Sequence, residues 1–182
     1  FAGVYLQDEW KPRPRLTVNY GARFDAFSSP FDRENQLSPR INLIWQVTDA
    51  SSVHAGYARY FTPPPLENIP ASTVATFAGT SNAAAVTQDD PVRSERAHYF
   101  DLGFSSNLSR EWHVGLDGYY KNARNQLDDG LFGQTLIQSA FNYQQGRIYG
   151  LEFSMSYTHG IFASYLKLAH CTAQGKDWSS AQ

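Results

Sequence analysis

Apolar residues recur at every second position along most of this chain, and that period limits its fold more than any other feature. From residue 16 to residue 25 the even positions hold Leu, Val, Tyr, Ala and Phe, and the odd positions hold polar residues or glycine. In an α-helix these apolar side chains would spread around the whole circumference, whereas in a β-strand they lie on one face. The stretch therefore predicts a strand with one apolar and one polar face.

The same alternation recurs along the chain and predicts about eight strands. They lie near residues 4–10, 16–25, 40–47, 53–57, 99–104, 112–121, 149–157 and 161–171. In the last stretch, apolar residues at even positions compete with apolar residues at odd positions. Which face of that strand is apolar therefore stays open.

Short and long connections alternate between these strands. The short ones, near residues 12–15, 48–51, 106–110 and 158–160, are rich in Pro, Asp, Asn, Ser and Gly, which are the residues of tight turns. The longer ones cover roughly residues 28–37, 62–94 and 123–145. A membrane barrel with turns on the periplasmic side and loops on the outer side produces this alternation.

The composition agrees with strands that cross a membrane. Aromatic residues make up 15% of the 182 residues, and Trp10, Trp45 and Trp112 lie near predicted strand ends, where interfacial aromatic residues of membrane barrels occur. The predicted strands run to about ten residues, more than the five or six usual in soluble sheets. A net charge of −2 gives no electrostatic reason to expect a nucleic-acid partner.

These patterns predict an all-β fold, the wall of an antiparallel up-and-down transmembrane β-barrel with about eight strands. Two alternatives remain open. Eight strands could close on themselves as a small outer-membrane barrel with a structural or adhesion role. Alternating strands also describe a soluble β-sandwich, in which Trp and Tyr would bind carbohydrate.

Five motifs resemble the barrel of TonB-dependent receptors. Residues 5–11 and 16–25 are similar to a "QDEW" hairpin followed by an "L-x-L-x-x-G-x-R-x-D" strand, and residues 37–43 to the next strand. Residues 54–69, 93–103 and 146–153 resemble three further strand motifs of the family. The sequence departs from the family's usual residues at Ala58, Thr62 and Asp101.

The resemblance implies an active-transport receptor for a scarce ligand such as a ferric siderophore, a cobamide or a glycan. It implies a location in the bacterial outer membrane, in contact with lipid, and a barrel of about 22 strands around a plug. Residues 1–182 would then be part of the barrel domain, without the plug, the TonB box or the C-terminal closing strand. The expected partners are the plug of the same full-length chain, the TonB system and an unidentified small ligand.

No pattern predicts an enzyme, a cofactor or a metal site. The five histidines lack metal-ligand spacing, and no GxSxG motif is present. Asp89-Asp90 and Asp128-Asp129 could jointly hold a cation, but they lack the Ca²⁺-loop pattern and we expect them to be solvated. The single cysteine, Cys171, is expected to be buried or to face lipid.

Charged residues in phase with the polar positions are the candidate functional residues. Charge on a lipid-exposed face costs about 2–4 kcal/mol near the membrane midplane, so these side chains are expected to point into the lumen. They are Arg23, Arg40, Asp101, Asp117, Lys121 and Glu152. They could contact ligand or plug, or they could form a structural series of ion pairs along the wall, which is the favoured reading. Arg59 shares the phase of the apolar residues and is expected at the outer rim.

Overall fold

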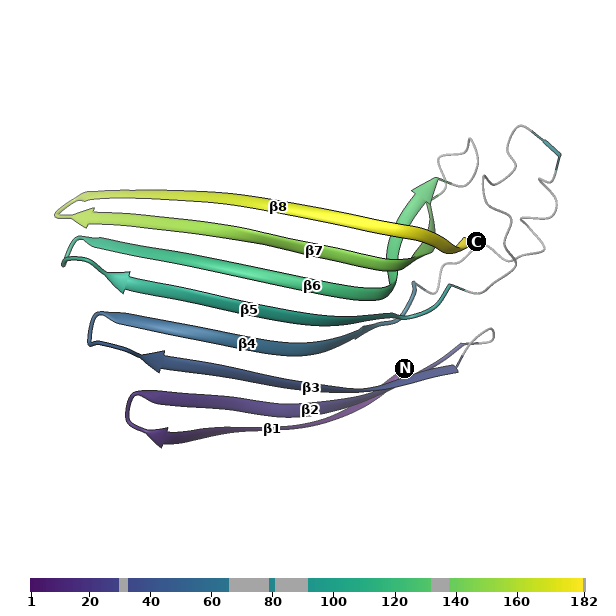
Figure 1. Ribbon diagram of the computed structural model, residues 1–182, viewed down its shortest axis with the longest axis horizontal. Helices are drawn as coiled ribbons and strands as arrows, with labels where there is room; N and C mark the ends of the chain where they lie inside the picture. The colour runs from purple at the N-terminus through teal and green to yellow at the C-terminus, as the bar shows by residue number, and fades with distance from the viewer. Residues whose placement is uncertain (30–32, 66–78, 81–91, 132–137, 182) are drawn as a thin grey trace.

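The computed structural model describes residues 1–29, 33–65, 79–80, 92–131 and 138–181. They form an eight-stranded antiparallel sheet in which each strand pairs with the next one along the chain (Figure 1). The strands are β1 (Ala2–Arg13), β2 (Leu16–Ser28), β3 (Arg33–Gln46), β4 (Ser51–Thr62), β5 (Glu95–Asn107), β6 (Trp112–Leu131), β7 (Gln138–His159) and β8 (Phe162–Ala181). The predicted all-β, up-and-down architecture and the number of strands are confirmed.

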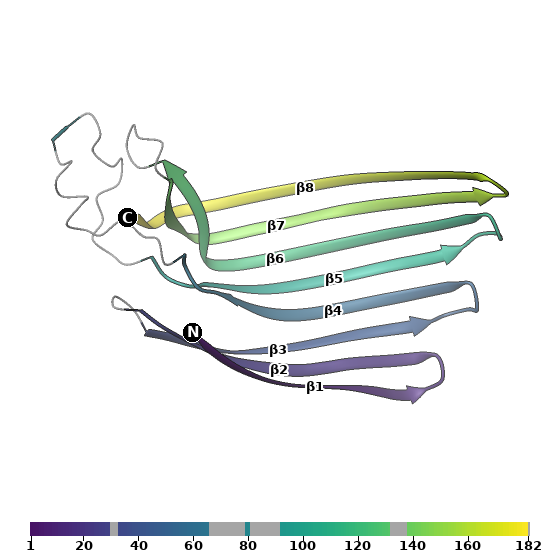
Figure 2. The ribbon, with the colours of Figure 1, turned by 180° about the vertical axis from the view of Figure 1, so that it is seen from behind.

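The four short connections all lie at one end of the sheet, which we call the turn end, and the other connections lie at the opposite loop end (Figure 2). Two predicted loops are wrong in extent, because the strands continue through polar residues. The β2–β3 connection shrinks to residues 29–32 and the β6–β7 connection to residues 132–137. Alternation detects a strand only where one face is apolar, whereas backbone pairing continues without an apolar face.

The register brings the apolar residues of neighbouring strands together on one face. One cross-strand row of directly paired residues, the aromatic row, runs Tyr20, Ile41, Tyr57, Phe100, Tyr120 and Tyr149. Most large apolar side chains of this face are exposed; Leu151, for example, is 59% exposed. A broad exposed apolar face is unusual on a soluble protein and suits contact with lipid.

The apolar band crosses the strands obliquely. On β2 and β3 it reaches Phe24 and Leu37, which lie four positions beyond the aromatic row toward the loop end. On β8 it ends at Leu168, which pairs with Phe153 and lies four positions before the row. Between β2 and β8 the loop-end edge of the band therefore moves by eight residues over six strand-to-strand steps. At about 3.3 Å per residue and about 4.8 Å per strand, this shift corresponds to a strand tilt of about 40°. This is the tilt of strands in membrane barrels, and Figure 1 shows the turns shifting accordingly from β1–β2 to β7–β8.

Three of the four tryptophans lie along the turn end of this band. Trp10 pairs with Val18 on the apolar face, and Trp45 pairs with Leu16. Trp112 packs on Tyr157, with ring centroids 4.7 Å apart. Their positions near the turns fit the expected interfacial belt.

Pairing with β7 decides the facing of the last strand. Leu166 and Leu168 pair with Met155 and Phe153, so the even positions of β8 lie on the apolar face. Cys171 pairs with Gly150 on the polar face and is exposed. The expectation of a buried or lipid-facing Cys171 is therefore wrong, because a shift of one residue exchanges the two faces of a strand.

The arrangement bears on both alternative folds. A β-sandwich needs two packed sheets, whereas all eight strands here belong to one sheet. β1 and β8 are the two edges of that sheet, so it is open, as a segment of a larger barrel would be, and is not a closed eight-stranded barrel. Among the described residues, no helix is long and apolar enough to cross a membrane.

Candidate functional site

Glycines on the polar face let side chains from strands two apart meet. Gly21 pairs with Gln7 on one side and with Arg40 on the other, and the Arg40 guanidinium donates to the Gln7 side-chain oxygen at 2.7 Å across it. Gly103 lies in the same way between His54 and Asp117, and a Cβ added at Gly103 would collide with both side chains. At both positions the absence of a side chain makes room for polar neighbours on the adjacent strands.

Two carboxylates share one imidazole in the middle of the polar face. His54 Nε2 lies 3.6 Å from Asp101 Oδ2 and 3.4 Å from Asp117 Oδ1, so the cluster joins β4, β5 and β6. All three side chains are partly exposed, with Asp117 the most open at 48%. Among the ion pairs between described residues, these two carboxylates have no lysine or arginine partner.

Three of the other four predicted charges form ion pairs along the wall, whereas Arg40 bonds to the neutral Gln7 side chain. Arg23 Nε lies 2.6 Å from Asp25, which is 4% exposed. Glu152 pairs with the Lys167 ammonium at 2.6 Å. Lys121 pairs with Glu95, which is also buried.

All six predicted residues therefore lie in phase on the polar face. Asp101 and Asp117 come together around His54, and Glu152 pairs directly with Asp117 across β6 and β7. Contact of any of the six with ligand or plug stays a prediction. The observed pairs agree with the favoured interpretation, in which such charges form a structural series of ion pairs along the wall.

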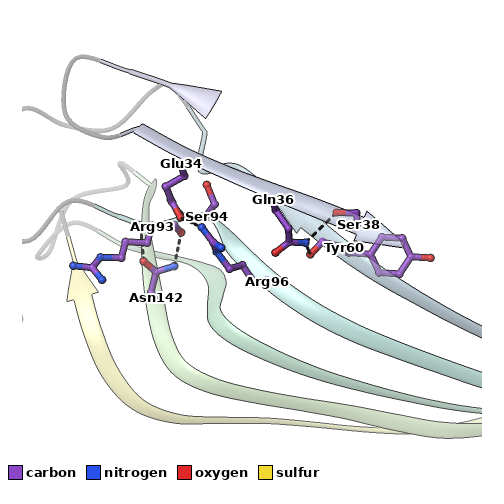
Figure 3. Close-up of polar contacts among 8 residues, drawn as sticks. All are labelled: Glu34, Gln36, Ser38, Tyr60, Arg93, Ser94, Arg96 and Asn142. Carbon is purple, nitrogen blue, oxygen red and sulfur yellow. Dashed lines mark hydrogen bonds and ion pairs between the residues drawn. The ribbon is translucent and has the colours of Figure 1, made fainter. Parts of the chain in front are cut away.

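A buried polar cluster lies at the loop end, where β3 and β4 separate (Figure 3). Backbone pairing between these strands extends only as far as Arg40 and Ala58. Beyond that pair, the Gln36 side-chain amide donates to the Tyr60 carbonyl at 2.9 Å and to the Ser38 hydroxyl at 3.0 Å. A side chain thus satisfies a backbone carbonyl where the strands no longer pair.

The same rim holds the end of the long β4–β5 connection. Asn142 on β7 accepts from the Arg93 amide at 2.7 Å and donates to the Arg93 carbonyl at 3.0 Å. Glu34 on β3 accepts from the Ser94 amide at 2.6 Å and from the Arg96 guanidinium at 2.9 Å. Asn142 and Ser94 are almost fully buried, so residues 93–94 are fixed between β7 and β3 (Figure 3).

Sequence reasoning missed this rim cluster and His54. The rim contacts join residues 49 and 60 positions apart, and no local pattern signals such pairs. His54 could have been found, because it shares its phase with Gly56 and Ser52 on the polar face. Its partners, Asp101 and Asp117, can be identified only from the strand register.

The described residues contain no group of three or more His, Cys, Asp or Glu placed to hold a metal ion. Asp128 and Asp129 are consecutive residues of β6, so their side chains point to opposite faces. Asp89-Asp90 lies outside the described residues.

The chain resembles solved structures of two metal transporters and a siderophore receptor over almost its whole length. The FrpB iron transporter from Neisseria meningitidis (F5-1 variant) is 18% identical, with a TM-score of 0.74 over 96% of this chain and 26% of that one. The siderophore receptor PirA from Pseudomonas aeruginosa is 20% identical, with a TM-score of 0.70 over 97% and 34% of the two chains. The copper transporter OprC is 16% identical, with a TM-score of 0.69 over 95% and 29%.

These likenesses establish the fold, and the chain spans about a quarter to a third of the length of those proteins. No curated protein matches the sequence significantly. Residues 1–180 match the family model described as TonB dependent receptor-like, beta-barrel. The chain therefore belongs to the TonB-dependent receptor β-barrel family, whose members are outer-membrane transporters and not enzymes.

Proposed function

We propose that this chain forms part of the wall of a receptor that takes up a scarce ligand across the bacterial outer membrane, energised through TonB. The observation that carries the proposal is the oblique apolar band, whose drift across the strands corresponds to a tilt of about 40°. Membership of the TonB-dependent receptor family supports active transport as the purpose of such a wall.

In this proposal, the turn end faces the periplasm, the loop end faces outward, and the polar face lines the lumen. Residues 1–182 supply part of the barrel domain, and the plug and TonB-contacting segment belong to the same full-length chain. Iron, siderophore and copper transporters among the structural neighbours make a metal-containing ligand the first to test, ahead of a cobamide or a glycan.

Growth on limiting ligand tests this proposal. A strain without the full-length receptor should grow poorly when one of ferric siderophore, copper, cobamide or glycan is limiting, and the receptor gene should restore growth only when TonB is present. Equal growth of the two strains on every ligand, or rescue without TonB, would contradict the proposal.

Asp101 and Asp117 are the polar-face residues for which we propose contact with plug or ligand. Both carboxylates share the single His54 imidazole, whereas Glu152 has its own lysine. Two carboxylates that lack a full cationic partner favour a positively charged group of the plug or ligand.

A double variant, Asp101→Asn with Asp117→Asn, should reduce uptake at an unchanged amount of folded receptor. Glu152→Gln provides the comparison, because its charge is paired within the wall. Unchanged uptake in the double variant would instead support a purely structural role for both carboxylates.

A further inference from the structure

Four arginines lie on the apolar side of the sheet, just beyond the aromatic row at the loop end. Arg59 and Arg147 occupy the paired row two positions beyond the aromatic residues, and Arg96 and Arg124 occupy the row four positions beyond. Directly paired residues share a face of the sheet. We call these four arginines the basic belt.

The belt contains no acidic residue at these levels. From β4 to β8, the row two positions beyond the aromatic residues consists of Arg59, His98, Asn122, Arg147 and Gln174. The row four positions beyond consists of Phe61, Arg96, Arg124, Gln145 and Lys176. The positive charges of neighbouring strands therefore reinforce one another. At the turn end, by contrast, Lys11 pairs with Glu9 at 2.8 Å and Arg15 pairs with Asp49 at 2.6 Å.

Three of the four arginines have no partner among the described residues. Arg124 and Arg147 are exposed and form no ion pair or hydrogen bond there, and the buried Arg59 Nε has no hydrogen-bond acceptor. Arg96 pairs with Glu34, yet its strand position lies directly opposite Arg124. Like charges directly opposite in a sheet are destabilising, so the arrangement favours an anion supplied from outside.

The height of the belt fits a lipid headgroup layer, given the membrane orientation of the proposed function. Two to four residues along a strand tilted by about 40° rise about 5–10 Å above the aromatic row. The polar region outside the hydrocarbon core of a bilayer is about this thick. The aromatic row runs perpendicular to the strands, so at this tilt it climbs about 3 Å per strand from β4 to β7. Arg96, Arg124 and Arg147 would thus lie near one level, that of phosphates in the outer leaflet. Arg59 would lie about 10 Å lower, where its long side chain can extend toward the same phosphates.

We propose that the basic belt binds the phosphates of an anionic glycolipid in the outer leaflet. Guanidinium groups bind phosphate oxygens in a bidentate manner, and each basic residue near an anionic surface contributes about fivefold in affinity. The site lies on the outside of the barrel, so it is distinct from the ligand path in the lumen. It would hold the receptor at a fixed depth in the leaflet.

Lipid retention by the detergent-solubilised full-length receptor tests this inference. The probe is lipid A, an acylated, phosphorylated disaccharide, with its dephosphorylated form as comparison, and native mass spectrometry counts the bound lipids. A variant with Arg59, Arg124 and Arg147 all changed to Gln should bind lipid A about a hundredfold more weakly. Arg110→Gln, at an exposed turn-end position, should bind as the wild type does.

Several results would overturn the inference. Equal binding of lipid A by the triple variant, or of the dephosphorylated lipid by the wild type, would exclude phosphate recognition by the belt. Displacement by an equal concentration of inorganic phosphate would show a simple anion site instead of a lipid site. The single variants Arg124→Gln and Arg147→Gln, each expected to bind about fivefold more weakly, serve if the triple variant does not fold.

The inference rests on the proposed function, but the two can fail separately. A receptor that does not insert into lipid, or does not restore TonB-dependent growth, contradicts the proposed function. A receptor that inserts and transports but shows no preference for the phosphorylated lipid contradicts the belt alone.

Discussion

Asn142 offers the sharpest test of how the loop end is organised. Asn142 is 1% exposed, and with described residues its side chain forms three hydrogen bonds, two with the Arg93 backbone and one with the Asn125 carbonyl. Asn142→Ala removes all three and leaves the backbone groups without partners. A hydrogen bond contributes about 1 kcal/mol net, so the anchoring of residues 93–94 should weaken by about 3 kcal/mol.

Hydrogen exchange measures this loss directly. The reporter is the Ser94 amide, which is bonded to Glu34 and not to Asn142, so a change there reports release of the segment and not the trivial loss of an acceptor. A weakening of about 3 kcal/mol corresponds to about a hundredfold faster exchange through local opening.

Two control variants sharpen the result. Asn142→Asp keeps the acceptor for the Arg93 amide but places a buried carboxylate oxygen against the Arg93 and Asn125 carbonyls, so at neutral pH its effect should be at least as large as that of Asn142→Ala. Asn122→Ala, at an exposed position without a side-chain hydrogen bond among the described residues, should leave Ser94 exchange unchanged. Wild-type exchange at Ser94 in Asn142→Ala would refute the reasoning, since Glu34 alone would then hold the segment.

Three further predictions test the assignment of the two faces, each in the full-length receptor. Gly21→Ala places a Cβ 2.5 Å from a backbone oxygen and should lower the free energy of unfolding of the barrel by about 1–3 kcal/mol, measured with denaturant. In Gly118→Ala the nearest atom to the new Cβ is the flexible end of Leu151 at 3.2 Å, so the free energy of unfolding should fall by less. Leu151→Arg, inside the apolar band, should cost about 2–3 kcal/mol in the same assay, and equal stability of Leu151→Arg and Ser154→Arg would contradict the assigned faces. A fluorophore on Cys171 should escape quenching by brominated lipid, while one on Leu151→Cys in a Cys171→Ser background should be quenched.

The sequence predicted the number of strands and most of their facing, because alternation is a local property that a buried or lipid-covered face imposes on each strand separately. Strand extents were not predictable in this way. β6 and β7 pair as far as Leu131 and Gln138, through residues with no apolar phase. The facing of β8 also escaped local reasoning, since Ile161 in the turn continues the wrong phase and only pairing with β7 decides it.

Long-range contacts account for the rest of what was missed. The buried Asn142 and Glu34 lie in polar stretches that, taken alone, favour exposed loops. Their partners, Arg93 and Ser94, come from the end of a connection between other strands. Since no period links such residues, only the curvature of the assembled sheet brings them together.

Glycine provides the link between the local pattern and the candidate site. A glycine in phase with polar residues leaves a gap on that face, so the side chains paired with it on both sides can reach one another. Gly21 joins Gln7 to Arg40 in this way, and Gly103 joins His54 to Asp117. The predicted charges could therefore be assigned to a face from the sequence, but their partners required the register. Once the register is known, Asp117 is found to share the His54 imidazole with Asp101. Because one imidazole faces two carboxylates, positive charge is lacking at this part of the polar face, and contact with plug or ligand is best tested there.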